Sequence, residues 1–101
     1  MITVDADHGG VIADYIARGP AIIRGLCESA CTLALSYTHT CVYPQARLGF
    51  HQASTDAGTH LLWEMYPRTV RAWIKQHGGL HANVIYMNGV EAIRLGTSRC
   101  R

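Results

Sequence analysis

A serine, a histidine and two groups of backbone amides are the features of this sequence that fit acyl-transfer chemistry. Ser29 lies at a predicted strand-to-helix turn, and the pair Gly9-Gly10 lies at another. The first amides of a helix have no acceptor within the helix, so a helix start can hold an anion. We therefore expect the amides of Gly10 and Ala30 to hold the oxyanion that forms when Ser29 attacks a carbonyl group.

The base in this scheme is His51, which leaves a predicted strand after Ser29. Element order places it better than the other histidines to take the proton from Ser29 and return it to the leaving group. A structural interpretation stands beside this one, in which Ser29 caps a helix and His51 is a hydrogen-bonded structural residue. The local pattern alone favours the capping role.

The cysteines raise the question of a metal site. Cys27 and Cys31 are four residues apart, a spacing that resembles that of zinc ligands. Further candidate ligands are His39, Cys41, His51 and His60. The paired C-x2-C or H-x3-H units of most zinc sites are absent, so the pattern favours buried thiols or one disulfide. We interpret Cys27 and Cys31 as small apolar residues around the turn, and expect no metal and no cofactor.

The composition is typical of one small globular domain spanning residues 1–101. The chain has 49% hydrophobic and only 16% charged residues, against about 25% charged in average proteins. This balance excludes disorder and indicates that a partner covers part of the surface. The net charge of +2 is too small for the basic surface of a nucleic-acid-binding protein.

No apolar stretch approaches the roughly 20 residues of a membrane-spanning helix. The first ten residues also lack the basic and apolar regions of a signal peptide. We therefore expect a soluble protein, and the sequence leaves open whether it is cytoplasmic or periplasmic.

Apolar periodicity predicts strands that alternate with helices. The expected strands are residues 1–4, 21–27, 40–43 and 47–50, and the expected helices are 11–18, 30–37, 60–77 and a final one from Asn88 to Gly96. The helix at 30–37 is apolar on nearly every face, and Pro67 should kink or divide the long one. Asn88 should cap the last helix while Glu91 reaches back to it. This order predicts an α/β domain with parallel βαβ connections.

Two longer runs resemble the ClpP/crotonase superfamily, and in particular its ClpP-like serine peptidases. They are Gly-Leu-Cys-Glu-Ser-Ala-Cys-Thr-Leu-Ala-Leu at 25–35 and Tyr-Pro-Gln-Ala-Arg-Leu-Gly-Phe-His-Gln at 43–52. Gly9-Gly10 is similar to the family's Ser-Pro-Gly-Gly segment, and residues 86–96 are similar to its later Phe-Leu-Ser-Ala-x-Glu-Ala…Gly stretch. The matches follow the family order over nearly the whole chain. They are most similar to a short branch of periplasmic ClpP-like proteins.

The resemblance implies a role for each matching residue. Ser29 is the nucleophile, His51 the general base, and the amides of Gly10 and Ala30 the oxyanion hole. The implied fold is the family's stacked ββα units, and the implied substrate is a peptide or protein. Val84 stands where the family has its aspartate, so the site is a Ser-His dyad or an incomplete triad with Asn83 as a candidate third member.

The chain lacks the family's earlier strands, so we expect a minimal or truncated version of the fold. Such a version exposes an edge strand, which favours a homo-oligomer, and residues 63–73 are the candidate interface. The main alternative function is a catalytically inactive module of the same fold that binds a peptide and assembles. A crotonase-type enzyme that holds an acyl-CoA thioester is less favoured, because Glu28 is the only carboxylate near the pocket.

Overall fold

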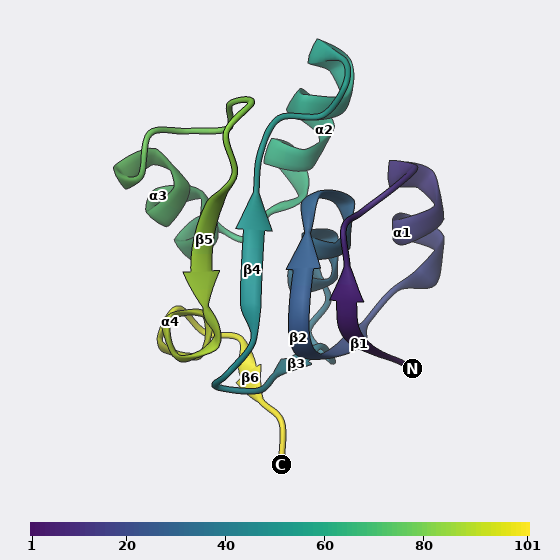
Figure 1. Cartoon of the computed structure of the whole chain (residues 1–101), viewed down its shortest axis with the longest axis vertical. Coiled ribbons are helices and arrows are strands. Elements are labelled where there is room, and N and C mark those ends of the chain that lie inside the picture. Colours follow the sequence, from purple (N-terminus) through teal and green to yellow (C-terminus); the bar gives the residue numbers. More distant parts are fainter.

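Strand β2, Ala21–Glu28, is the strand around which the sheet is built (Figure 1). The computed structural model describes residues 1–101, and its six strands form one sheet in the order β5-β4-β2-β3-β6, with β1 also paired to β2. The other strands are β1 Ile2–Asp7, β3 Cys41–Val42, β4 Arg47–Phe50, β5 Ile85–Asn88 and β6 Ser98–Arg99. The helices are α1 Ile12–Arg18, the 3-10 helix η1 Ser29–Ser36, α2 Asp56–Met65, α3 Arg68–Gln76 and α4 Gly89–Arg94.

The register of β2 explains why the sheet curls. Its whole length pairs with β1 in parallel, whereas on the other side Ile22 pairs with β3 and Leu26 pairs with β4. Strands β3 and β4 therefore follow one another along a single side of β2. Figure 1 shows β1, β2 and β4 pointing the same way, so their carboxyl ends meet at one edge of the sheet.

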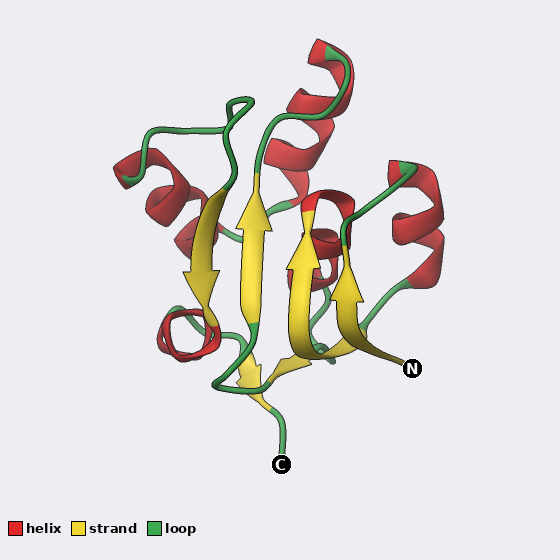
Figure 2. Ribbon diagram, in the orientation of Figure 1, coloured by secondary structure: helices red, strands yellow, loops and turns green.

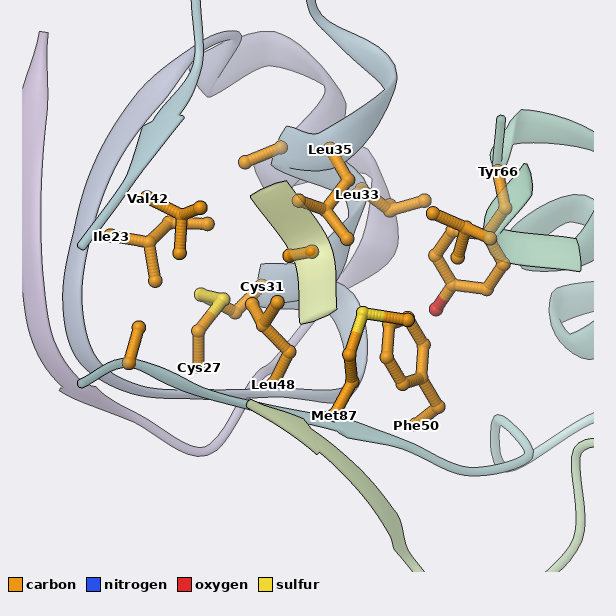
Figure 3. Close-up of a cluster of buried hydrophobic side chains, with 14 of the residues drawn as sticks. Ile23, Cys27, Cys31, Leu33, Leu35, Val42, Leu48, Phe50, Tyr66 and Met87 are labelled. Atoms are coloured by element: carbon orange, nitrogen blue, oxygen red, sulfur yellow. A yellow bond between two sulfur atoms is a disulfide. The ribbon is translucent and has the colours of Figure 1, made fainter. Parts of the chain in front are cut away.

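Helices η1, α2 and α3 lie behind the sheet in the view of Figure 2 and cover one of its faces. Side chains alternate in β4, where Leu48 and Phe50 are buried and Arg47 is exposed. The ring of Phe50 lies 5.3 Å from that of Tyr66 and 5.8 Å from that of Trp73, measured between centroids. Figure 3 shows Phe50 and Tyr66 among the other buried side chains that pack between the sheet and the helices.

Several predicted elements are confirmed. Residues 30–35 are all buried, as their apolar pattern indicates, although the segment is a 3-10 helix. Pro67 divides the long helical pattern, because α2 ends before it and α3 begins after it. The side chain of Asn88 caps α4 by accepting a hydrogen bond from the amide of Glu91 at 2.8 Å. The carboxylate of Glu91 does not reach back to Asn88, since it binds Arg94 instead.

The expected α/β class is confirmed, but the expected parallel connections are wrong for one strand. Strand β5 runs antiparallel to β4. Two successive helices separate these strands where a βαβ unit has one, so the chain returns to the edge at which β4 ends and β5 must run back from it. The observed sheet is a single mixed sheet, which leaves the expectation of stacked ββα units as a proposal.

All four cysteines form disulfides, so the interpretation of Cys27 and Cys31 as apolar filler is wrong. Cys27 bonds to Cys31, and Cys41 bonds to Cys100. The first pair lies at the end of β2 and one turn into η1, with the two Cα atoms 5.4 Å apart. Strand β6 pairs with β3 and thereby carries Cys100 to Cys41. No group of three or more His, Cys, Asp or Glu side chains is arranged to hold a metal ion.

None of the helices combines the length and the apolar character needed to cross a membrane. The longest, α2, has 10 residues.

The two disulfides are expected to contribute differently to stability. The Cys41–Cys100 bond spans 59 positions and the Cys27–Cys31 bond spans 4. Loop-closure entropy predicts that replacing both members by alanine lowers the free energy of unfolding by about 4 kcal/mol for the long loop and about 2 kcal/mol for the short one. Urea-induced unfolding of the two double variants measures both values. Equal losses of unfolding free energy would contradict the explanation by loop length.

Candidate active site

The carboxyl ends of β1, β2 and β4 surround an open pocket of about 580 Å³. Gly10, Ser29 and His51 all line it, so the structure brings together three of the predicted site residues. The remaining lining residues come from the start of α1 and from the loop that leads into α2: Val11, Ile12, Ala13, Gln52, Ala53, Ser54, Thr55 and Gly58. The pocket therefore joins segments that are far apart in the sequence.

Ser29 has an unusual backbone conformation. Its φ angle of 57° makes it the only residue other than glycine with a positive φ. A left-handed conformation is unfavourable for an L-residue and persists only where surrounding structure imposes it. A serine held in this way between a strand and a helix has the geometry of a nucleophile elbow, which exposes the hydroxyl above the sheet.

The structure does not support the capping role for Ser29. The cap position of η1 belongs to Glu28, and no side chain makes a capping hydrogen bond there. The hydroxyl of Ser29 has no hydrogen-bond partner among the side-chain contacts, and the residue is half-buried at the pocket wall. Its hydroxyl therefore has no structural role in the cap that would account for a serine at this position.

A buried hydrogen-bond chain supports the turn from below. The hydroxyl of Thr32 donates to the carbonyl oxygen of Ser29 at 2.6 Å. Because that bond uses the only proton of the Thr32 hydroxyl, the contact of 2.7 Å between Thr32 and Tyr66 must have the tyrosine as its donor. Burial raises the pKa of Tyr66 well above its usual range, so this donor stays protonated.

Gly9 packs directly against the Ser29 turn. A Cβ atom at Gly9 would lie 2.7 Å from the Cβ of Ser29 and 2.9 Å from the carbonyl oxygen of Glu28, and its φ is 92°. The carboxylate of Asp7 fixes this segment by accepting hydrogen bonds from the Gly9 amide at 2.8 Å and from the Tyr15 hydroxyl at 2.6 Å. Only glycine fits at position 9, which explains the first of the two glycines that follow β1.

The two predicted oxyanion amides lie at this junction. The amide of Gly10 donates no hydrogen bond within the structure. Ala30 is the second residue of η1, where the helix itself provides no acceptor, and its nitrogen would lie 3.2 Å from a Cβ at Gly9. Gly10 lines the pocket, whereas Ala30 is buried and is not among the lining residues, so of the two predicted donors the structure places only Gly10 at the pocket wall.

His51 is half-buried, and its ring is held by a backbone carbonyl. Its Nδ1 lies 2.6 Å from the carbonyl oxygen of Gln52. A carbonyl can only accept, so Nδ1 carries the proton and Nε2 of the neutral ring is free to accept one. The structure has no hydrogen bond between His51 and Ser29. Asn83 is exposed in the loop before β5 and makes no hydrogen bond with His51, so it stays a prediction as third member.

A buried carboxylate beside the serine was not assigned a role from the sequence. The side chain of Glu28 is only 12% exposed and accepts hydrogen bonds from the hydroxyl of Tyr86 at 2.5 Å and from Nδ1 of His8 at 2.6 Å. The absence of a side chain at Gly49 leaves room for it, since a Cβ there would lie 2.8 Å from the Cγ of Glu28. The guanidinium of Arg47 covers the ring of Tyr86.

Glu28 is kept ionised by these contacts. The hydrogen bond from Tyr86 is the main reason that the pKa of Glu28 lies below its ordinary value. Burial raises this pKa, but the effect of Tyr86 and the smaller lowering effects of His8 and His51 outweigh it. A fixed negative charge therefore lies one residue before Ser29. No local pattern signals this cluster, because Tyr86 is 58 residues away along the chain.

Comparison with known proteins adds no family assignment. No family model matches the chain, and a search of curated proteins found no match. The motifs and the pocket geometry are therefore the basis for a functional proposal.

Replacing Gly9 with alanine should destabilise the protein more than the same change at Gly78. Both glycines have a positive φ, but a Cβ at Gly78 meets no atom within 4 Å, whereas one at Gly9 collides with Ser29. We expect Gly78→Ala to cost about 1 kcal/mol from backbone strain and Gly9→Ala about 1 to 3 kcal/mol more from overpacking. Urea-induced unfolding measures the difference, and equal costs would show that the Gly9 contact is unimportant.

Glu28 should make the protein sensitive to acid. Its folded-state pKa lies below the ordinary value of about 4.5, so its charge stabilises the folded state at neutral pH and this contribution disappears as the pH falls from about 4.5 through the lowered value. We expect Glu28→Gln to cost about 1 to 3 kcal/mol at neutral pH and less in acid. Unfolding curves over pH measure this, with Glu64→Gln, an exposed glutamate, as control. If the loss of stability in Glu28→Gln did not depend on pH, the ionised form of Glu28 would not be the source of the stabilisation.

Proposed function

We propose that the protein is a serine hydrolase that cleaves peptide bonds by acyl transfer through Ser29, as ClpP-like peptidases do. One observation carries the proposal: Ser29 has a left-handed backbone, a hydroxyl without a partner, and a place in the same pocket as His51 and Gly10. Strained backbone at a strand-to-helix turn is characteristic of functional serines. The motif resemblance independently assigns the same residues to the same roles.

The proposed reaction assigns one step to each of these groups. Nε2 of His51 takes the proton of the Ser29 hydroxyl as the oxygen attacks the carbonyl carbon of the peptide. The amides of Gly10 and Ala30 hold the resulting oxyanion. The imidazolium then protonates the leaving amine, the C–N bond breaks, and water activated by His51 hydrolyses the acyl ester. Bound substrate must bring Ser29 and His51 within hydrogen-bond distance, since catalytic contacts often tighten only in the complex.

The carbonyl of Gln52 takes the place that a carboxylate has in a full triad. It holds His51 in the tautomer that leaves Nε2 free, but it is uncharged and stabilises the imidazolium less. In a serine protease, replacing the triad aspartate with asparagine lowers turnover by about 10⁴-fold because the histidine takes the wrong tautomer, and the Gln52 carbonyl avoids that part of the loss. Because no charged partner holds the imidazolium, we expect a slow enzyme whose acylation is easier to detect than its turnover.

A non-catalytic peptide-binding module of the same fold is the second candidate. The absence of a hydrogen bond between Ser29 and His51 favours it, as does Val84 at the place of the family's aspartate. A binding module needs the pocket and its amide donors but not a reactive hydroxyl. The two candidates therefore differ in the reactivity of Ser29.

Self-association and an oxidising compartment belong to the same proposal. Strand β1 pairs with β2 alone and presents Met1 and Ile2, which are exposed, at the edge of the sheet. The expected interface at residues 63–73 is less suitable, because Trp73 is buried in the core. Two disulfides favour an oxidising compartment over the cytoplasm.

A fluorophosphonate probe tests the reactivity of Ser29 directly. We expect one covalent label per chain, located on Ser29 by peptide mapping, and none on Ser29→Ala. His51→Gln should slow labelling by about 10²-fold or more, since it removes the base. Ser54→Ala is the matched control, because Ser54 lines the same pocket without a left-handed backbone, and it should label like the unchanged protein. A label on another residue, or none on folded protein, would favour the binding module.

A further inference from the structure

A disulfide brackets the candidate nucleophile. Cys27 lies two residues before Ser29 at the end of β2, and Cys31 lies two residues after it in η1. Their bond closes the strand-to-helix turn and joins the two Cα atoms at 5.4 Å. The only left-handed residue that is not glycine therefore sits midway in a ring of five residues.

The positions of the two cysteines match the places where a nucleophile elbow has glycine. The pattern Gly-x-Ser-x-Gly puts small residues two before and two after the serine, where strand and helix approach closely. In this chain the pattern is Cys-x-Ser-x-Cys. A covalent bond across the turn stands where the elbow has glycines, and it joins the end of the strand to the first turn of the helix.

We infer that the Cys27–Cys31 bond is a redox-sensitive clamp that keeps Ser29 in its reactive conformation. This inference rests on the proposed function of Ser29. Without the bond, Ser29 relaxes from its unfavourable φ toward an ordinary one, and the hydroxyl and the Ala30 amide move away from the positions that acylation needs. The noncovalent contacts of Thr32 and Gly9 remain but do not close the turn.

The chemistry is thiol–disulfide exchange with a dithiol reductant. A thiolate of the dithiol attacks one sulfur of the pair and forms a mixed disulfide, and its second thiol then displaces the remaining cysteine. The dithiol becomes a disulfide, and Cys27 and Cys31 take up two electrons and two protons as free thiols. Both cysteines are buried, so exchange requires the turn to open. The half-buried Cys41 belongs to the other disulfide, which lies outside the pocket.

Two double variants separate clamping from general stabilisation. Cys27→Ala/Cys31→Ala should label with the fluorophosphonate at least tenfold more slowly than the unchanged protein, at a temperature where circular dichroism shows both to be folded. Cys41→Ala/Cys100→Ala, the matched control, should label at the unchanged rate despite its lower melting temperature. Unchanged labelling of folded Cys27→Ala/Cys31→Ala would overturn the inference.

If Cys27→Ala/Cys31→Ala does not fold, reduction of the unchanged protein tests the clamp instead. Dithiothreitol is added in steps, and mass spectrometry after thiol alkylation counts reduced Cys27 and Cys31 while circular dichroism follows folding. The labelling rate should fall in proportion to the reduced fraction and recover when the pair reoxidises. A rate that stays constant in folded, reduced protein would refute the clamp.

A structural readout keeps the clamp separate from the hydrolase proposal. If no form of the protein is labelled, the proposed function fails, and the crystal structure of the reduced protein tests the clamp alone. The φ of Ser29 should then leave the left-handed region. A φ that stays near the present value in the absence of the bond would show that Thr32 and Gly9 suffice, and would overturn the inference.

Discussion

The left-handed turn at Ser29 is the constraint on which the candidate site depends. One residue with φ of 57° redirects the chain from the end of β2 into the buried helix η1 and leaves its own hydroxyl at the pocket. The strain is maintained by contacts from several directions: the disulfide across the turn, Thr32 from within the core, and Gly9 from the end of β1. The strained conformation of Ser29 therefore depends on the surrounding contacts together.

The same arrangement explains why the domain can form a site with so few residues. Parallel pairing of β2 with β1 and β4 brings three strand ends to one edge, and each provides one residue of the candidate site. The end of β1 provides Gly10, that of β2 provides Ser29, and that of β4 provides His51. The carboxylate of Glu28 lies one residue before Ser29 and carries a charge, and the carbonyl of Gln52, one residue after His51, holds the imidazole ring.

Local patterns predicted the elements better than they predicted the contacts between them. The burial of residues 30–35, the break at Pro67 and the cap at Asn88 depend on neighbours within one or two turns, so the sequence displays them. The antiparallel direction of β5 and the pairing of Cys41 with Cys100 depend on where the chain returns after long connections. No spacing rule signals such returns, so these features appear only in the folded chain.

The candidate site also contains some features that local patterns predicted and others that only long-range contacts create. Ser29, His51 and the glycine pair could be identified from turns, element order and family motifs, whereas the bonds between Glu28, Tyr86 and His8 join three separate segments. The most direct test of the central claim is a crystal structure of the protein after reaction with a fluorophosphonate. We predict a bond from Ser29 Oγ to phosphorus and a phosphoryl oxygen about 3 Å from the amides of Gly10 and Ala30. An unmodified Ser29, or a phosphoryl oxygen turned toward solvent, would contradict it.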